Sequence, residues 1–200
     1  MASKTVEFWF DVGSAASYVA WYRLPQIAQR TGATIDYRPM LLGGVFQATG
    51  NQSPVNIRAK GEWLHKDLER FAQRDGTAYQ RNPHFPINTL ALMRIAIGLQ
   101  QQGDEPMRRF VDAAFRAIFA EPKNMNDAQT VAGVIEEAGF DPEALLALAG
   151  DPAIKERLKA VTAEAVQRGV FGAPTFFVRG EMHWGQDRLD WVEQALQQEA

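Results

Sequence analysis

The chain has 200 residues, of which 46% are hydrophobic and 22% charged, a composition typical of one globular domain and not of a disordered chain. Its 21 basic and 24 acidic residues give a formal net charge of −3, which argues against a nucleic-acid-binding protein because such proteins need a basic face. The chain contains no cysteine, which excludes disulfides, thiolate metal clusters, a cysteine nucleophile and a CxxC redox pair.

The amino-terminal residues have neither the basic head nor the apolar core of a signal peptide, and no apolar stretch approaches the ~20 residues of a membrane span. We therefore expect a cytoplasmic protein that does not bind membranes. The three histidines, His65, His84 and His183, are scattered and have no carboxylate at ligand spacing, so the sequence predicts no metal site.

The first part of the chain predicts a strand, a helix and a second strand. Residues 5–10 read TVEFWF, an aromatic and β-branched run typical of a buried strand. Apolar residues recur at helical spacing over residues 15–30, and Ser14 stands where this helix should begin. Pro25 lies within the pattern and predicts a kink or a break into two helices. Residues 34–38 alternate like a strand, so we expect a βαβ unit with parallel strands.

The centre of the chain has a different character. From about residue 54 to residue 169 nearly the whole sequence reads as helix. Asp141-Pro142 and Asp151-Pro152 each place an N-cap residue before a proline at the first helical position. These signals predict a block of helices in the middle of the chain.

Strand character returns near the carboxyl end. Residues 173–179 form a β-rich run, Gly180 permits a turn, and residues 181–184 supply the returning strand of a hairpin. Trp184 on this second strand is interpreted as a core residue. A last amphipathic helix completes the chain.

The order βαβ, helices, ββα predicts an α/β protein with one mixed sheet interrupted by helices. With a proline opening the third strand, this order is similar to the thioredoxin-like fold carrying a large all-helical insertion. We expect residues 1–45 and 165–200 to form a single thioredoxin-like unit. The insertion then spans about residues 46–164.

Five segments carry a closer resemblance. They are FWFDVGSAASYVA at residues 8–20, GNQ at 50–52, AKG at 59–61, FPIN at 85–88 and GVFGAPTFFVRGEMHWGQDRL at 169–189. Together they resemble the 2-hydroxychromene-2-carboxylate isomerases and their relatives, the class kappa glutathione transferases, which share a DsbA-like thioredoxin fold. The resemblance runs through essentially the whole chain and is most specific in the terminal segments. It implies glutathione as the cofactor and a homodimer as the assembly.

The resemblance implies that Ser14 donates a hydrogen bond to the sulfur of glutathione. The position suits this role because a helix amino terminus carries about half a positive charge, which favours a thiolate. Thiol pKa values near 8.5 fall to about 3.5–7.5 in such settings. From the residues alone, a plain N-cap serine worth about 1 kcal/mol of stability is an equally good interpretation.

The resemblance also implies a cis peptide bond between Ala173 and Pro174. The backbone N–H and C=O of Ala173 would then pair with the cysteinyl part of glutathione, a short case of β-augmentation. Without the resemblance, a trans proline opening an edge strand is the better interpretation.

The remaining implied contacts lie around the two ends of glutathione. Gln186 and Asp187 would meet the γ-glutamyl group, although the family usually has Ser or Asn where this chain has Gln186. Asp187 could instead only cap the helix. Asn51 and Lys60 would meet the glycyl end, whereas a solvated surface role is commoner for a lysine. Asn88 is offered as a substrate contact, and a buried asparagine that fixes a loop is the alternative.

These implications predict a glutathione-dependent isomerase that converts 2-hydroxychromene-2-carboxylate to trans-o-hydroxybenzylidenepyruvate in the degradation of naphthalene-type aromatic compounds. The thiolate would add to the small aromatic carboxylate, the ring would open, a bond would rotate, and the thiol would leave unchanged. A kappa-type transferase or peroxidase that consumes glutathione shares the same site and stays open. A third possibility is a non-catalytic thioredoxin-fold module that binds a peptide or a partner.

Overall fold

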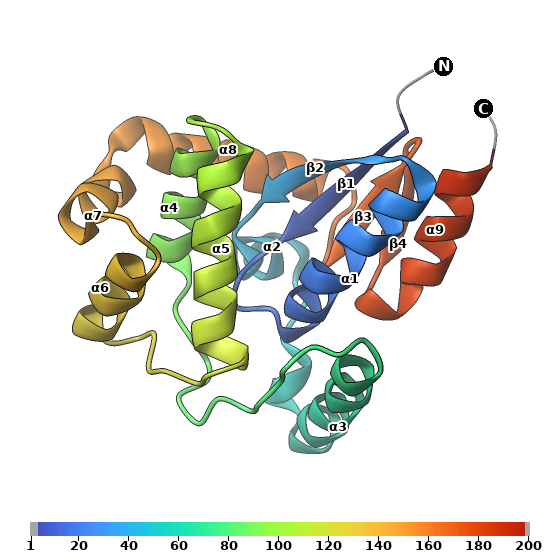
Figure 1. Ribbon diagram of the computed structural model, residues 1–200, viewed down its shortest axis with the longest axis horizontal. Helices are drawn as coiled ribbons and strands as arrows, with labels where there is room; N and C mark the ends of the chain where they lie inside the picture. The colour runs from blue at the N-terminus through green and yellow to red at the C-terminus, as the bar shows by residue number, and fades with distance from the viewer. Residues whose placement is uncertain (1–3, 199–200) are drawn as a thin grey trace.

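Residues 4–198, which the computed structural model describes, build a mixed sheet with helices around it (Figure 1). β1 (Thr5–Phe10) pairs in parallel with β2 (Thr34–Pro39). β1 also pairs antiparallel with β3 (Thr175–Val178), and β3 pairs antiparallel with β4 (Glu181–Trp184), which gives the strand order β2-β1-β3-β4. The predicted βαβ unit, the hairpin and the mixed sheet are confirmed.

The first helix, α1 (Ala15–Thr31), has the ends that the sequence predicts. Ser14 is its N-cap, and the Ser14 side chain accepts the backbone N–H of Ser17. Gly32 ends it in a left-handed conformation, with a φ of 68°, that favours glycine. The helix continues through Pro25, so of the two predicted outcomes the break into two helices is wrong, and the kink stays a prediction. The single run places the amino terminus of α1 beside the turn that follows β1.

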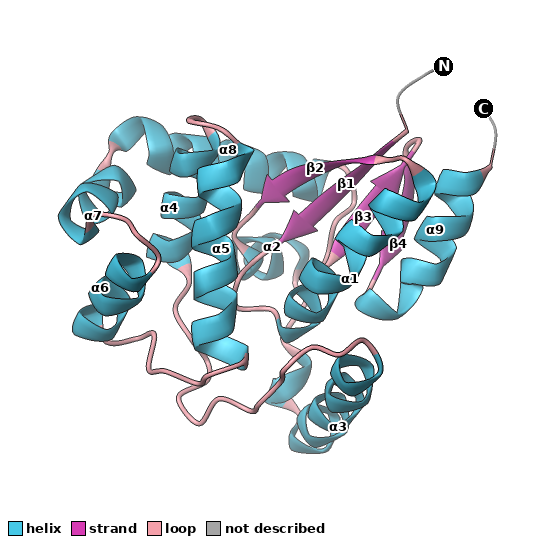
Figure 2. Ribbon diagram, viewed as in Figure 1, coloured by secondary structure: helices cyan, strands magenta, loops and turns pink. Residues whose placement is uncertain are grey.

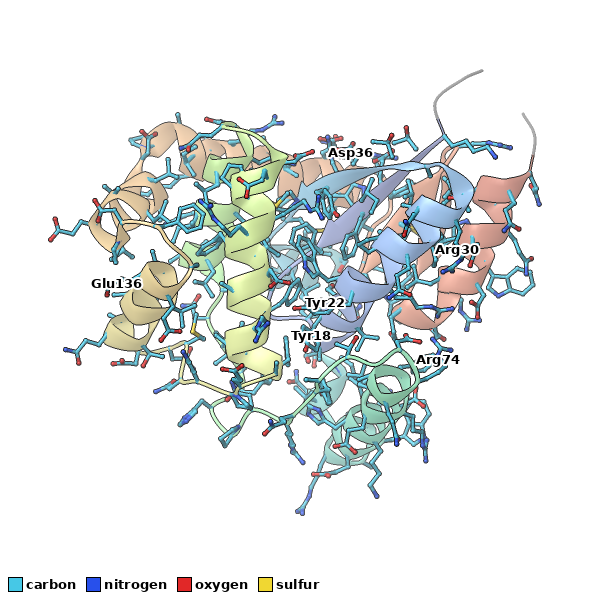
Figure 3. The ribbon with its side chains drawn as sticks, in the orientation of Figure 1. Tyr18, Tyr22, Arg30, Asp36, Arg74 and Glu136 are labelled. Carbon is cyan, nitrogen blue, oxygen red and sulfur yellow. The ribbon has the colours of Figure 1, made fainter. Side chains whose placement is uncertain are left out.

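Two helices cover one face of the sheet. α1 and α9 (Leu189–Gln197), which follows the short 3-10 turn η2 (Gln186–Arg188), lie side by side in front of the strands in Figure 2. Arg30 of α1 donates to both carboxylate oxygens of Glu193 at 2.8 and 2.9 Å, and Figure 3 shows Arg30 near α9. This ion pair is exposed and adds little, so burial of the apolar side of α9 holds the two helices against the sheet.

The connection between β2 and β3 is mostly helical, as predicted. Its elements are α2 (Leu42–Thr49), the 3-10 turn η1 (Pro54–Asn56), α3 (Arg58–Arg74), α4 (Leu90–Gln100), α5 (Asp104–Phe119), α6 (Ala128–Glu137), α7 (Pro142–Gly150) and α8 (Pro152–Gln167). Asp141 and Asp151 cap α7 and α8 as expected. The expected division near residues 45 and 165 falls inside α2 and α8, and the division itself stays a prediction. Within residues 4–198, no helix combines the length and the apolar character needed to cross a membrane.

The loop at residues 75–89 interrupts the helices, which the helical interpretation of residues 54–169 did not foresee. Pro83 and Pro86 explain the interruption, because proline lacks the N–H that a continuing helix needs. The loop is nevertheless anchored. The buried Asn82 side chain donates to the carbonyl oxygens of Ile118 and Lys123, each at 3.0 Å, which ties the loop to the end of α5.

Aromatic side chains join the sheet to α1 and α5. Phe10 of β1 contacts Trp21 of α1 with ring centroids 5.4 Å apart, and Trp21 contacts Phe115 of α5 at 5.6 Å. Tyr18 and Tyr22 project from α1 into the space beside α5 in Figure 3, and the Tyr22 hydroxyl donates to Asp112 of α5 at 2.8 Å. Each fully buried side chain of this size contributes about 1.5–3 kcal/mol to the free energy of unfolding. The aromatic contacts therefore fix α5 against α1 and the sheet.

Close packing between α4 and α7 supports a stability prediction. A Cβ atom added at Gly98 of α4 would lie 2.8 Å from two carbons of Leu148, whereas one at Gly133 of α6 would meet nothing within 4 Å. We expect Gly98→Ala to lower the free energy of unfolding by about 1–3 kcal/mol through overpacking. Gly133→Ala is expected to raise it by about 0.5–1 kcal/mol through helix propensity. Chemical denaturation tests both, and equal stability of the two variants would contradict this packing.

Candidate active site

A cavity of about 580 Å³ lies beside the amino terminus of α1. Its other walls come from the segment between α2 and α3 and from the residues around β3, β4 and η2. Most of the residues predicted to bind glutathione line it together: Ser14, Asn51, Lys60, Ala173, Gln186 and Asp187. Pro174 is not among the lining residues, and Asn88 lines a neighbouring cavity. The structure thus brings into one place side chains that are far apart in the sequence.

Ser14 lies at the edge of this cavity with 8% of its surface exposed. Its Oγ accepts the N–H of Ser17 at 3.1 Å and donates to the carbonyl oxygen of Ala173 at 3.0 Å. The side chain is therefore both a helix cap and a hydroxyl at the cavity wall, so the two interpretations of Ser14 coexist. Its hydrogen would have to turn away from Ala173 before it could point at a bound sulfur.

The Ala173–Pro174 peptide bond is cis, as the resemblance implies. The carbonyl of Ala173 accepts the Ser14 hydroxyl, and the next carbonyl, that of Pro174, accepts the N–H of Gly185 at 3.0 Å. The N–H of Ala173 has no acceptor within residues 4–198. This backbone donor at the cavity wall is therefore available to a ligand.

Asn51 and Lys60 line the cavity from exposed positions. The Asn51 amide nitrogen donates to the carbonyl of Phe171 at 2.7 Å, and its oxygen accepts the N–H of Gln52 at 2.8 Å. Asn51 thereby links the segment after α2 to the residues before β3. Lys60, in the first turn of α3, forms no ion pair within the described part of the chain, so its charge is free for an anionic group.

Gln186 and Asp187 occupy the turn before α9. Gln186 is buried, with 7% of its surface exposed, whereas Asp187 is exposed and its Oδ2 lies 3.4 Å from Nη2 of Arg188. The Asp187 carboxylate lies so close to Gly185 that a Cβ there would be 2.4 Å from its Oδ1. Gly185 also has a φ of 104°, a conformation that other residues rarely adopt. This glycine therefore lets the carboxylate sit at the cavity wall.

Two tryptophans at the cavity were not predicted. Trp184 is 49% exposed, so its interpretation as a core residue is wrong: it lies on the edge strand β4, where the ring contacts Phe171 at 4.9 Å and lines the cavity. Trp63 of α3 is 61% exposed and also lines the cavity. The sequence did carry a signal for Trp63, because it is a large aromatic residue within a charged helix.

A second cavity, of about 830 Å³, adjoins the first and shares several wall residues with it, including Gly13, Phe46 and Phe85. Asn88 lines this second cavity and is exposed, so it is not the buried asparagine of the alternative interpretation. Its Oδ1 accepts the N–H of Leu90, a local contact that starts α4. Any role of Asn88 with a substrate stays a prediction.

A buried carboxylate supports the turn that carries Ser14, and sequence reasoning missed it. Asp11 is 1% exposed, and its two oxygens accept the N–H groups of Gly13 and Leu42, each at 2.8 Å, while the Thr89 hydroxyl donates to it as well. Burial raises the pKa of Asp11 above its ordinary value, although these three donors work in the opposite direction. The only sequence signal was an acidic residue directly after a buried strand.

Comparison with known proteins agrees with this geometry. Residues 5–197 match the model of the DSBA-like thioredoxin domain. A 2-hydroxychromene-2-carboxylate isomerase from Sphingobium xenophagum is 35% identical over 97% of this chain and 98% of its own. A solved 2-hydroxychromene-2-carboxylate isomerase has a TM-score of 0.82 at 34% identity, covering 96% of this chain and 94% of its own. Human glutathione S-transferase kappa 1 is 24% identical over 96% of this chain and 91% of its own.

These matches confirm the thioredoxin-like fold with a helical insertion and the resemblance carried by the five sequence segments. A second isomerase, from Pseudomonas putida, is 36% identical over 93% of its own chain, so isomerases from two organisms match over nearly their full length. The chain therefore belongs to the DSBA-like thioredoxin-domain family and, within it, to the 2-hydroxychromene-2-carboxylate isomerase family.

Proposed function

We propose that this protein is an isomerase that uses glutathione as a recycled cofactor and acts on a small aromatic carboxylate such as 2-hydroxychromene-2-carboxylate. One observation carries the proposal. In a chain without cysteine, a serine hydroxyl and an unpaired backbone N–H meet at a helix amino terminus inside a cavity. The name of the isomerase relatives supports the reaction class, and the name of the kappa transferase relatives supports the cofactor.

The donors around Ser14 fit the sulfur of glutathione, which supplies a nucleophilic thiolate when bound. The Ser14 hydroxyl, which donates to the Ala173 carbonyl in this structure, would turn toward the sulfur of bound glutathione and donate to it. The positive end of α1 adds to this stabilisation, because the first N–H groups of a helix attract negative charge. The Ala173 N–H would bind the peptide part of the cofactor by short β-augmentation.

The charged groups of the cavity fit the two ends of the tripeptide. Asp187 suits the α-ammonium of the γ-glutamyl group, and Gln186 lies beside it with a longer side chain than the Ser or Asn usual in the family. Lys60 suits the glycyl carboxylate, with Asn51 nearby. A cavity of about 580 Å³ lies within the range of small-ligand sites. The aromatic substrate then occupies the adjoining cavity, on the other side of Phe46 and Phe85.

The cofactor requirement is tested with two ligands. We expect isomerisation, followed by ultraviolet absorbance, to require glutathione and to leave its concentration unchanged. S-methylglutathione, which keeps both carboxylates and the ammonium but has no free thiol, is expected to raise the melting temperature without supporting turnover. Equal rates with and without glutathione would remove the cofactor from the proposal. Failure of both tripeptides to bind would favour a non-catalytic module.

A kappa-type transferase is the second candidate, because the relatives include glutathione S-transferase kappa 1 proteins of human and rat. The two activities share the thiolate site and differ in the fate of glutathione. A conjugate that accumulates in proportion to substrate consumed supports the transferase, and an unchanged glutathione pool supports the isomerase. A homodimer, a cytoplasmic location and a place in the breakdown of naphthalene-type compounds stay predictions drawn from the resemblance.

A further inference from the structure

The second cavity has a wall suited to a flat ring. Phe46 of α2 and Phe85 of the loop at residues 75–89 line it together with Ile87 and Leu90. Both phenylalanines also line the first cavity, so they mark the border between the two. An aromatic molecule packed against them would lie next to the Gly13–Ser14 turn. This placement brings an aromatic acceptor within reach of a nucleophile held at Ser14.

The charge in this cavity comes from one residue. Among the side chains that line it in the described part of the chain, Arg81 is the one permanent cation. Asp11 is buried and fully engaged by backbone and hydroxyl donors. Burial lowers the pKa of His65, and the nearby charge of Arg81 lowers it further against the opposing effect of Glu62 and Glu69, which favours the neutral imidazole.

Arg81 keeps part of its guanidinium group free. Its Nη1 donates to both carboxylate oxygens of Glu62 at 3.1 and 3.2 Å, and this is its ion pair with α3. Its Nη2 and Nε have no partner within residues 4–198. The neighbouring residue, Asn82, is buried and anchored to two carbonyl groups, so the backbone that carries Arg81 is held firmly. A carboxylate could therefore bind the free edge without displacing Glu62.

We propose that Arg81 determines the specificity of this site by binding the carboxylate of an aromatic acceptor whose ring packs against Phe46 and Phe85. The inference rests on the proposed function and goes beyond it by assigning a residue to the charged group of the acceptor. Lys60 is the competing cation. Lys60 lines the first cavity, which is the proposed cofactor site, and does not line the second.

Two substrates that differ only in the carboxylate test this assignment. We expect Arg81→Gln to raise the KM for 2-hydroxychromene-2-carboxylate about 10- to 100-fold, the effect of losing a hydrogen-bonded charge partner. The same variant is expected to leave kcat/KM unchanged for 2-hydroxychromene, which has the ring and hydroxyl but no carboxylate. The KM of Arg81→Lys for the carboxylate substrate should lie between those of the wild type and Arg81→Gln, because lysine keeps the charge and loses the planar donor pair.

Matched variants separate ligand binding from the ion pair. Glu62→Gln breaks the same pair while leaving Arg81 in place, so we expect the KM for the carboxylate to stay equal or to fall. Arg116→Gln removes an arginine with a similar exposed partner, Glu121 at 3.2 Å. This variant should leave the KM for both substrates unchanged. The assignment is overturned if Glu62→Gln reproduces the effect of Arg81→Gln, or if Arg81→Gln raises the KM for both substrates equally. It is also overturned if Lys60→Gln raises the KM for the carboxylate substrate and Arg81→Gln does not.

A binding experiment separates this inference from the proposed function. Calorimetry with trans-2-hydroxycinnamate and with its amide needs no turnover. The wild type should bind the acid more tightly, and Arg81→Gln should bind the two equally. If the wild type isomerises nothing but shows this preference, the proposed reaction fails and the Arg81 assignment survives. If the wild type is an active isomerase and Arg81→Gln still prefers the acid, the assignment alone fails.

Discussion

Replacing Ser14 by alanine is expected to lower kcat/KM for the glutathione-dependent reaction by about 10²–10³-fold, the usual effect of removing one donor aimed at a reacting anion. The remaining N–H groups of α1 still favour a thiolate, so activity should not vanish. The pKa of the bound thiol should rise, because the hydroxyl donates more strongly to the ionised sulfur than to the neutral one. Thiolate absorbance measured against pH on the glutathione complex reports this shift directly.

Ser17→Ala is the matched control for Ser14→Ala. Ser17 lies one turn along the same helix, and its hydroxyl is buried with no hydrogen-bond partner in the described structure. Its removal should leave both the activity and the thiol pKa unchanged. Ser14→Ala also removes the N-cap of α1, which costs about 1 kcal/mol of stability. Equal activities of the two alanine variants would show that Ser14 is only a helix cap.

Replacing Asp11 by alanine is expected to destabilise the protein by about 2–5 kcal/mol, because two backbone N–H groups and one hydroxyl would lose their buried acceptor. Activity should fall as well, since Gly13 belongs to the turn that positions Ser14. Denaturant unfolding measures the loss. Asp104→Ala is the control, because Asp104 is exposed in the first turn of α5 and its removal should cost less than about 1 kcal/mol.

The pH dependence of stability gives Asp11 a second test. Its pKa is higher in the folded protein than in the unfolded chain, so its titration contributes stability that is fully present below the unfolded pKa. This contribution is lost as the pH rises through the folded pKa. Asp11→Asn cannot titrate, so its unfolding free energy should lack that decline between acidic and neutral pH. A decline of equal size in the variant would place the titration on another group.

Local sequence patterns were sufficient to predict the order of strands and helices. The strand at Thr5–Phe10, the caps at Ser14 and Asp151, and the hairpin before Trp184 each depend on neighbouring residues, which the sequence displays directly. The loop at residues 75–89 was missed although it carries Gly76, Pro83 and Pro86, because the strongly helical segments on both sides of it were read as one block. Helical pattern alone does not show where a chain must leave the helix to meet another element.

Most of the candidate site was predicted from the family resemblance and not from the residues themselves. Asp11 was missed because two of its donors, Leu42 and Thr89, lie far along the chain and become neighbours of Asp11 only in the folded protein. Trp184 was misread because an aromatic residue in a strand is usually buried, and only the sheet order places β4 at an edge. Long-range neighbours and edge positions are properties of the assembled fold.

The hydrogen bond between Ser14 and the Ala173 carbonyl has a consequence for selectivity. A ligand group accepts the hydrogen bond of the Ser14 hydroxyl only if it is a better acceptor than the Ala173 carbonyl. Neutral alcohols and un-ionised thiols do not meet that threshold, whereas an anion does, because charge-assisted hydrogen bonds are roughly twice as strong as neutral ones. The ligand-free protein thereby binds ionised groups at Ser14 in preference to neutral ones, before any chemical step.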